Sequence, residues 1–170
     1  MENEVALIAL GSNWGNSREL LNRAFASLQE LSLTPLIRSS IWKTAPVDCP
    51  PGSPSFLNAA AAIHVSADLS PEVLLKQLKQ LESDIGRVPK KIHNEPRAID
   101  LDIISFGKKR WNSETLTLPH PRAHLRRFVL VPLAEIAPGF CLPGFDTTVG
   151  DLLRNLHSSE ILSRHLVDPD

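Results

Sequence analysis

The sequence has little cysteine and no long apolar run. Its 170 residues include two cysteines, Cys49 and Cys141, far apart and without a nearby partner at a metal-ligand spacing. A zinc site or a disulfide scaffold is therefore disfavoured, and a reducing, cytoplasmic compartment is expected. The acidic start Met1-Glu2-Asn3-Glu4 lacks the basic and then apolar pattern of a secretory signal. Because no stretch is apolar enough to span a bilayer, we expect no membrane partner.

Charge of one sign and nucleotide-binding glycine motifs are also lacking. The formal net charge is −1, so no strong attraction of the whole protein to nucleic acid or anionic membrane is expected. Gly11-Ser12-Asn13 follows an apolar run, but no Gly-Lys-Ser/Thr follows it, and no dinucleotide glycine pattern occurs. The simplest interpretation of this tripeptide is a turn, and P-loop chemistry is disfavoured.

What is present is a regular succession of short apolar segments. Strands are predicted over residues 5–10, 36–43, 56–65 and 97–106. Between them, apolar spacing predicts a helix capped by Asn16 or Ser17 that runs to Leu31. Ser70-Pro71-Glu72 begins a second helix and Gly86 ends it. Its predicted buried stripe is Val73, Leu74, Leu78, Leu81 and Ile85.

Turn residues and prolines divide the remainder. The proline-rich stretch 44–54 and the polar, basic stretch 87–96 are predicted to be loops. After a turn at 107–109 we expect a short partner strand around 110–111 and an extended segment over 116–121. A helix over 128–136 is predicted despite Pro132, and Thr147 or Thr148 should cap a last helix through Leu156.

The order of elements predicts the fold class. Strand, helix, strand, strand, helix, strand is the split β-α-β-β-α-β, or ferredoxin-like, arrangement. Its product is a mainly antiparallel sheet with helices on one face, and the C-terminal helices would cover the other. We therefore predict an α+β, three-layer α/β/α sandwich. Because no repeat or interdomain linker is visible, residues 1–170 are expected to form a single domain.

The predicted strand over 97–106 carries two aspartates, Asp100 and Asp102, that alternate with apolar residues. Residues two apart in a strand point the same way, so the two carboxylates should share one face. An Asp-x-Asp pair alone can equally be a solvated surface or a loop cap. Its apolar setting favours a cation between the carboxylates, and Mg²⁺ commonly takes one or two carboxylates together with substrate phosphates.

Other polar residues could complete a site. The basic ones are Arg87, Lys90, Lys91, Arg97, Arg122, Arg126 and Arg127, with His120 and His124. They form either a solvated face or a polyphosphate clamp, and the acidic pair favours the clamp. Asn58 places an amide in an apolar strand, where it either satisfies a loop or binds the edge of a flat heterocycle stacked on Phe56 or Phe128.

Taken together, these residues resemble the 6-hydroxymethyl-7,8-dihydropterin pyrophosphokinase family over nearly the whole chain. The stretches that carry the resemblance are 9–13; 44–46 with 56–60; Glu82 with Gly86-Arg87; Pro96-Arg97-Ala98-Ile99-Asp100-Leu101-Asp102-Ile103; and 118–120 with 126–133. The fourth stretch is the most specific signature. The resemblance implies transfer of the terminal diphosphate of ATP to the pterin hydroxymethyl group with release of AMP, in folate biosynthesis, on a ferredoxin-like three-layer fold.

The resemblance also implies roles for individual residues, with ATP as co-substrate and two Mg²⁺ ions held by Asp100 and Asp102. Residues implied to contact the ATP phosphates are Arg87, Arg97, His120 and Arg126, of which Arg87 and Arg97, with the two aspartates, are the catalytic set. Residues implied to lie near the nucleotide are Glu82, Ile103, Leu116 and Thr117. Residues implied to line the pterin pocket are Thr44, Pro46, Phe56, Asn58 and Phe128.

The chain departs from the family pattern just before its signature strand. Asn94 and Glu95 stand where many members carry an aromatic residue and a glycine, and Pro89 stands where some have an arginine. These positions are where we expect the protein to differ from its relatives.

Two alternatives come from other classes. One is another Mg²⁺-dependent nucleotidyl transferase on a ferredoxin-like fold. The other is a non-enzymatic RNA-binding module, which the near-neutral charge and only nine aromatic residues disfavour. We expect a monomer whose partners are ATP and the pterin, with no nucleic acid.

Overall fold

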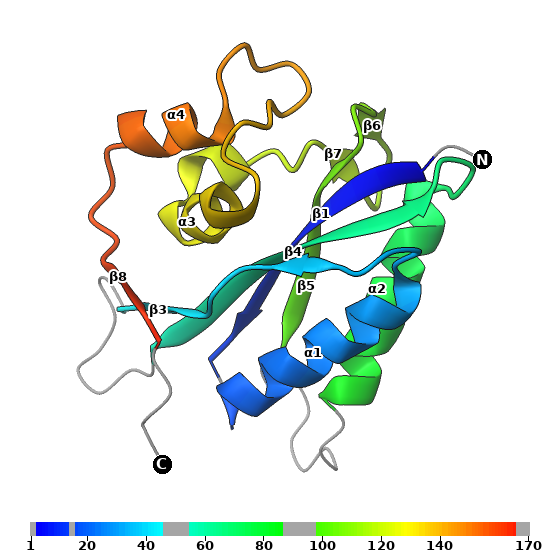
Figure 1. The fold of residues 1–170 in the computed structure, drawn as a ribbon, viewed down its shortest axis with the longest axis horizontal. Coiled ribbons are helices and arrows are strands. Elements are labelled where there is room, and N and C mark those ends of the chain that lie inside the picture. The colour runs from blue at the N-terminus through cyan, green and yellow to red at the C-terminus, as the bar shows by residue number, and fades with distance from the viewer. Residues whose placement is uncertain (1–2, 14–15, 46–54, 87–97, 166–170) are drawn as a thin grey trace.

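An antiparallel sheet runs through the middle of the molecule (Figure 1). The computed structural model describes residues 3–13, 16–45, 55–86 and 98–165. The strands are β1 (Asn3–Ser12), β2 (Ile37–Arg38), β3 (Trp42–Thr44), β4 (Phe56–Ser66), β5 (Asp100–Phe106) and β8 (Leu162–Arg164), with β6 (Trp111–Asn112) and β7 (Thr117–Leu118) in a separate hairpin. The helices are α1 (Ser17–Leu31), α2 (Pro71–Ile85), α3 (Arg127–Ile136) and α4 (Val149–Asn155), and a 3₁₀ turn spans Ala123–Leu125.

The strand order is β5-β1-β4-β3-β8, with β2 also paired to β4. The two longest strands, β1 and β4, pair from Asn3↔Ser66 to Ser12↔Leu57. The neighbours β5-β1-β4-β3 reproduce the order of a split β-α-β-β-α-β unit, so the predicted ferredoxin-like arrangement is confirmed.

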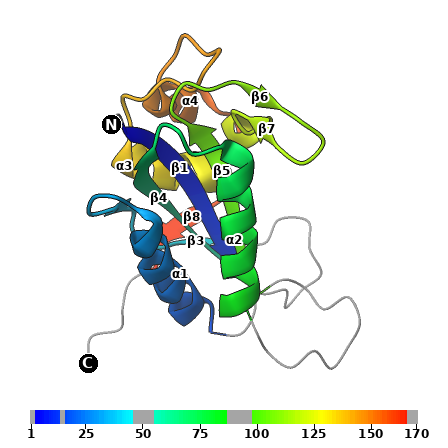
Figure 2. The same ribbon diagram turned by 90° about the vertical axis from the view of Figure 1, so that its right-hand side faces the viewer.

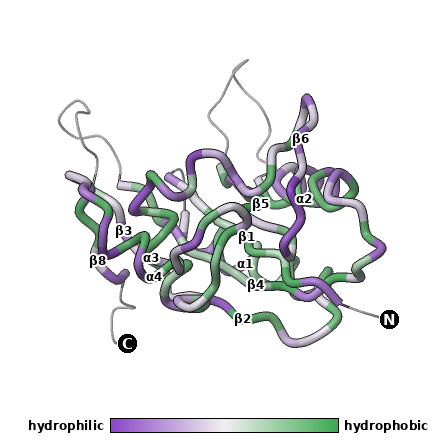
Figure 3. The backbone as a smooth tube through the Cα atoms, turned by 90° about the horizontal axis from the view of Figure 1, so that it is seen from above, coloured by the Kyte–Doolittle hydropathy of each residue, from purple (hydrophilic) through white to green (hydrophobic). Residues whose placement is uncertain are grey.

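Helices cover both faces of the sheet. Figures 1 and 2 show α1 and α2 against one face and α3 and α4 on the other. Two separate apolar cores match this arrangement: Ile8 and Leu10 of β1 belong to the core under α1 and α2, whereas Leu7 belongs to the core under α3 and α4. Figure 3 shows hydrophobic colouring where β1 and β4 cross the middle of the molecule. The predicted three-layer sandwich is therefore confirmed.

Side-chain caps fix where the helices begin. The Asn16 side-chain oxygen accepts from the Glu19 amide at 3.3 Å, Ser70 Oγ accepts from the Glu72 amide at 3.2 Å, and Thr148 Oγ1 accepts from the Asp151 amide at 3.1 Å. The sequence offered two candidate caps for α1, Asn16 and Ser17, and the structure uses Asn16. For α4 it offered Thr147 and Thr148, and the structure uses Thr148. None of the helices in the described ranges is both long and apolar enough to cross a membrane.

The buried face of α2 differs from the prediction at one position. Val73 was predicted to be buried but is 44% exposed, whereas Glu82 is only 9% exposed. The buried residues follow one helical stripe, which is Pro71, Leu74, Leu78, Glu82 and Ile85. Position 73 lies about 100° away from position 74 around the axis, so its side chain leaves that stripe.

The strand predicted over 36–43 is interrupted. It forms β2 and β3, with Ser39 between them. The Ser39 amide donates to the Ala60 carbonyl at 2.9 Å, and the Ala60 amide donates in turn to Ser39 Oγ at 2.8 Å. The hydroxyl thus takes the place of a backbone acceptor, and this local side-chain bond breaks the ladder.

The C-terminal part adds elements around the predicted helices. The strand expected near 110–111 is β6, which pairs with β7. The predicted helix over 128–136 is α3, and Pro132 lies inside it. The strand β8, which pairs with β3, had no sequence prediction.

Candidate active site

A cavity of about 360 Å³ lies on the α3 side of the sheet. It opens where β1 ends and where β4 and β5 begin. Its lining residues are Ala9, Leu10, Gly11, Thr44, Ala45, Phe56, Asn58, Asp100, Asp102, Ile104, His120, Arg126, Phe128, Val129 and Glu160. A volume of this size is typical of a small-molecule site.

Two carboxylates of β5 form one wall. Asp100 and Asp102 line the cavity, whereas Leu101 between them is fully buried on the opposite face. The predicted alternation is therefore confirmed. Opposite them on β1, Gly11 pairs with Asp100 and Ala9 with Asp102, so small residues leave the space beside the carboxylates open.

Gly11 leaves room for a close approach of the Asn58 side chain. A Cβ atom at this position would lie 3.1 Å from the Asn58 side-chain oxygen. Gly11 pairs with Asn58 across the β1–β4 ladder, so the glycine lets the amide reach the cavity.

The donor set at the carboxylate wall suits a hard cation. No group of three or more His, Cys, Asp or Glu side chains gathers within the described ranges. A cation held by Asp100 and Asp102 would therefore take its remaining ligands from outside these residues. Mg²⁺ binds in this way, through one or two carboxylates plus phosphates and water.

Basic side chains lie beside the acidic wall. The His120 amide donates to the Ile104 carbonyl at 2.8 Å, which fixes His120 beside β5. Its Nδ1 accepts from the Arg122 amide at 3.2 Å, so the neutral ring carries its proton on Nε2. Burial lowers the pKa of His120, an effect that nearby Asp102 opposes. Arg126 also lines the cavity, and its guanidinium carbon lies 5.7 Å from the centre of the Phe128 ring.

The remaining wall is apolar with one buried amide. Asn58 Nδ2 donates to Thr44 Oγ1 at 2.7 Å, and both residues are buried. Phe56, which is 42% exposed, and half-buried Phe128 line the same cavity. Aromatic faces beside a fixed amide and hydroxyl suit a flat heterocycle with a hydrogen-bonding edge.

Eight of the residues singled out from sequence are brought together in this cavity: Thr44, Phe56, Asn58, Asp100, Asp102, His120, Arg126 and Phe128. Arg87 and Arg97, which were predicted to be catalytic, lie outside the described residues, as do Pro46, Pro89, Asn94 and Glu95. Glu82, Ile103, Leu116 and Thr117 are described but do not line the cavity. Their contact with a nucleotide stays a prediction.

Glu82 lies behind the carboxylate wall. Its Oε2 accepts from the Leu101 amide at 2.8 Å, and its Oε1 lies 3.1 Å from Lys79 Nζ. Burial raises the pKa of Glu82, although both of these contacts oppose that shift. From the side of α2, Glu82 thus fixes the backbone between the two aspartates.

Glu72 holds the hairpin that carries Leu116 and Thr117. Its carboxylate accepts from Trp111 Nε1 at 3.0 Å and from Thr115 Oγ1 at 2.7 Å, and Ser113 also donates to it. The hydrogen bond from Ser113, followed by those from Thr115 and Trp111, lowers the pKa of Glu72. The hairpin is thus tied to the first turn of α2.

Some lining residues had no sequence signal for this site. Ala45, Ile104 and Val129 are apolar residues of the kind that any core contains. Glu160 is a single acid in a polar stretch with no motif around it. It lies just before β8, whose pairing with β3 brings this segment to the cavity.

Comparison with known proteins places these features in context. The family model described as "7,8-dihydro-6-hydroxymethylpterin-pyrophosphokinase (HPPK)" matches residues 7–138. The chain is 42% identical over 139 residues to a 2-amino-4-hydroxy-6-hydroxymethyldihydropteridine pyrophosphokinase of Haemophilus influenzae, covering 81% of this chain and 84% of that protein. It is 42% identical over 135 residues to the protein of the same name in Bacillus subtilis, covering 79% and 78%.

Solved structures agree with the fold. The HPPK-DHPS crystal structure from Plasmodium falciparum with pteroate superposes with a TM-score of 0.68 at 14% identity, covering 90% of this chain. The match spans 44% of that longer chain, so it supports the fold alone.

Proposed function

Because this chain belongs to the 7,8-dihydro-6-hydroxymethylpterin pyrophosphokinase family, we propose that it transfers the terminal diphosphate of ATP to 6-hydroxymethyl-7,8-dihydropterin. AMP and the pterin methyl diphosphate are the products, and the reaction belongs to folate biosynthesis. The observation that carries the proposal is one cavity lined by two carboxylates, a histidine and an arginine, and also by two phenylalanines and a buried amide. This arrangement matches a polyphosphate and a flat acceptor bound side by side.

The proposed step is an in-line displacement. The hydroxymethyl oxygen of the pterin forms a bond to the β-phosphorus as the bond from that phosphorus to the oxygen it shares with the α-phosphorus breaks. AMP takes the electron pair of that bond, and the hydroxyl proton passes to a phosphate oxygen or to water. The protein contributes positioning and charge neutralisation, which dominate catalysis of phosphoryl transfer.

Asp100 and Asp102 are proposed to hold two Mg²⁺ ions. When bound, Mg²⁺ supplies neutralisation of phosphate charge and orients the polyphosphate. The neutral ring of His120 offers an Nε2–H donor, and Arg126 offers a guanidinium that can bind a phosphate oxygen pair. Family resemblance adds Arg87 and Arg97 to this set.

The pterin is proposed to bind between Phe56 and Phe128. Asn58 and Thr44, already paired through a 2.7 Å hydrogen bond, would present fixed polar groups to its heterocyclic edge. Family resemblance adds Pro46 to the residues proposed to bind the pterin. We propose that the protein acts as a monomer in the cytoplasm, with these small molecules as its partners.

Identification of the products tests the proposal. ATP, Mg²⁺ and 6-hydroxymethyl-7,8-dihydropterin are incubated with the protein, and the nucleotide products are separated. AMP formed in step with the pterin diphosphate is expected. Free pyrophosphate would instead indicate nucleotidyl transfer, and ATP that remains unchanged would contradict the proposal.

A further inference from the structure

The segment from Ser158 to Arg164 contributes one side chain, Glu160, to the lining of the cavity. Its strand β8 pairs with β3, with Leu162 opposite Thr44. One residue further along, the Ala45 amide donates to the Ile161 carbonyl at 3.1 Å. This segment is thus fixed to the wall that contains Thr44 and Ala45, and it lies beyond residue 138, where the family match ends.

From this segment, the Glu160 carboxylate reaches across to α3. Its Oε2 accepts from the Arg127 amide at 2.8 Å and from Ser158 Oγ at 3.0 Å. Arg127 is the first residue of α3, and the N-cap residue Arg126 makes no side-chain capping bond. An acid from a distant segment therefore occupies the capping position of α3, where the helix dipole favours negative charge.

The start of α3 carries two side chains that line the cavity, one basic and one aromatic. Arg126 and Phe128 flank the capped residue, and both line the cavity. We propose that Glu160 is a positioning residue: by holding the Arg127 amide, it fixes the start of α3 so that Arg126 and Phe128 face the substrate. The identity of the substrate in this inference rests on the proposed function.

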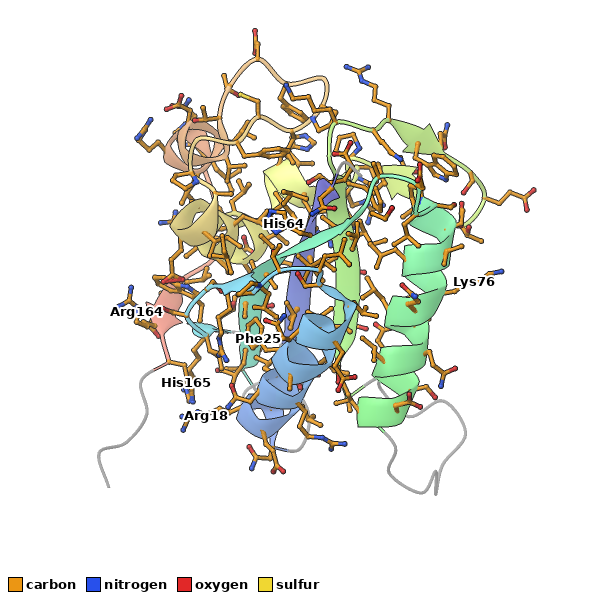
Figure 4. All side chains as sticks on the ribbon, turned by 45° about the vertical axis from the view of Figure 1, so that its right-hand side comes forward. Arg18, Phe25, His64, Lys76, Arg164 and His165 are labelled. Carbon is orange, nitrogen blue, oxygen red and sulfur yellow. The ribbon has the colours of Figure 1, made fainter. Side chains whose placement is uncertain are left out.

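A second acid offers a matched control. Glu135, also on α3, accepts from the Ser40 amide and from Ser40 Oγ, both at 2.6 Å, and lies 3.6 Å from Arg164 Nη2. Figure 4 shows Arg164 at the β8 edge of the molecule. Glu135 therefore also ties α3 to the strands, but it does not line the cavity.

The experiment compares Glu160→Ala, Glu160→Gln and Glu135→Ala in the full chain. Glu160→Ala is expected to raise the KM for the pterin roughly tenfold with a smaller change in kcat, because a displaced stacking ring weakens binding of the acceptor. Glu160→Gln keeps an oxygen acceptor and should stay within about threefold of the native KM. Glu135→Ala should lower the thermal midpoint and leave the KM within about twofold.

A readout that needs no substrate separates this inference from the proposed function. Amide hydrogen exchange at Arg127 should become faster in Glu160→Ala and stay slow in Glu160→Gln. Unchanged exchange in Glu160→Ala would overturn the inference whatever the activity. So would a KM that rises equally in Glu160→Ala and Glu135→Ala. Absence of AMP from the native protein overturns the proposed function, and the exchange result still decides whether Glu160 holds α3.

Discussion

The two aspartates of β5 put like charges on one face of a strand. Replacing Asp100 or Asp102 by asparagine keeps the shape of the side chain and removes its charge. Each variant should lose about 10³-fold or more in kcat, since stabilisation of the phosphates through these carboxylates is lost. The free energy of unfolding should stay close to the native value, because asparagine keeps the volume of the side chain and Leu101 between the aspartates stays buried. Steady-state kinetics and urea unfolding measure the two effects.

A matched control for these variants is Asp146→Asn, an exposed aspartate that does not line the cavity. Asp146→Asn should leave both kcat and the free energy of unfolding unchanged. Near-native turnover in Asp100→Asn or Asp102→Asn would remove the proposed metal site.

His120 should remain neutral at physiological pH. Burial lowers the pKa of its ring below the ordinary value of 6.5, and the opposing influence of Asp102 is smaller. The unfolded chain therefore takes up this proton at a higher pH than the folded protein does. The free energy of unfolding should fall as the pH drops from about 6.5 through the lower, folded pKa.

Urea unfolding between pH 5 and pH 8 tests this expectation. His120→Gln should flatten the dependence in that window, and replacing the exposed His157 by glutamine serves as the control. An NMR titration measures the pKa of the His120 ring directly. A His120 pKa at or above its ordinary value would contradict the assignment of a neutral Nε2–H donor.

Between elements, the contact of α2 with β5 supports the carboxylate wall from behind. Glu82→Ala removes the acceptor of the Leu101 amide, and it should lower the free energy of unfolding by about 1–3 kcal/mol. Glu82→Gln keeps an oxygen acceptor and should lose little at neutral pH. Chemical denaturation of both variants, with the exposed Glu30→Gln as control, measures these changes.

The pH dependence of this contact has the opposite sign to that of His120. Burial raises the pKa of Glu82, so the unfolded chain loses this proton at a lower pH than the folded protein does. The free energy of unfolding contributed by Glu82 should decrease as the pH rises from about 4.5 through the raised pKa. Glu82→Gln should lack this decrease, and an unaltered profile would show that Glu82 is not the group responsible.

Elements with strong local signals could be predicted from sequence. The caps Asn16 and Ser70 mark their helices because a side-chain oxygen satisfies a backbone amide at each start. The short strand β8 could not be predicted, because its three residues gain their structure from pairing with β3. Ser39 interrupts a strand through a bond to Ala60 that only the folded sheet creates.

The residues that line the cavity also divide into those that the sequence predicts and those that depend on the folded sheet. Asp100 and Asp102 are predictable because strand alternation alone places both side chains on one face. Arg126 and Phe128 were singled out by their residue types, as a basic and a stacking side chain, and family resemblance then implied a role for each. The place of Glu160 in the cavity could not be predicted from sequence, because its position depends on where a distant strand joins the sheet.

At the scale of the whole molecule, we propose that the chain folds as one cooperative domain. The two cores share the strands β1 and β4, whose residues face both layers of helices. Trp42 in β3 and Trp111 in β6 report on different regions. Denaturation followed by fluorescence of single-tryptophan variants should give coincident transitions at both positions and by far-UV circular dichroism. Separate midpoints would show that the layers unfold independently.

The placement of β1 in the sheet bears on how the protein is synthesised. β1 emerges first from the ribosome, yet its two partners, β4 and β5, begin only at Phe56 and Asp100. A nascent chain must therefore keep an apolar strand without a partner until β4 has been made, and without its second partner until β5 has been made. Glu160 is made later than all of these strands, so the cavity wall is completed only after they have been synthesised. A ribosome that stalls before this residue would carry a nearly folded sheet around an unfinished cavity.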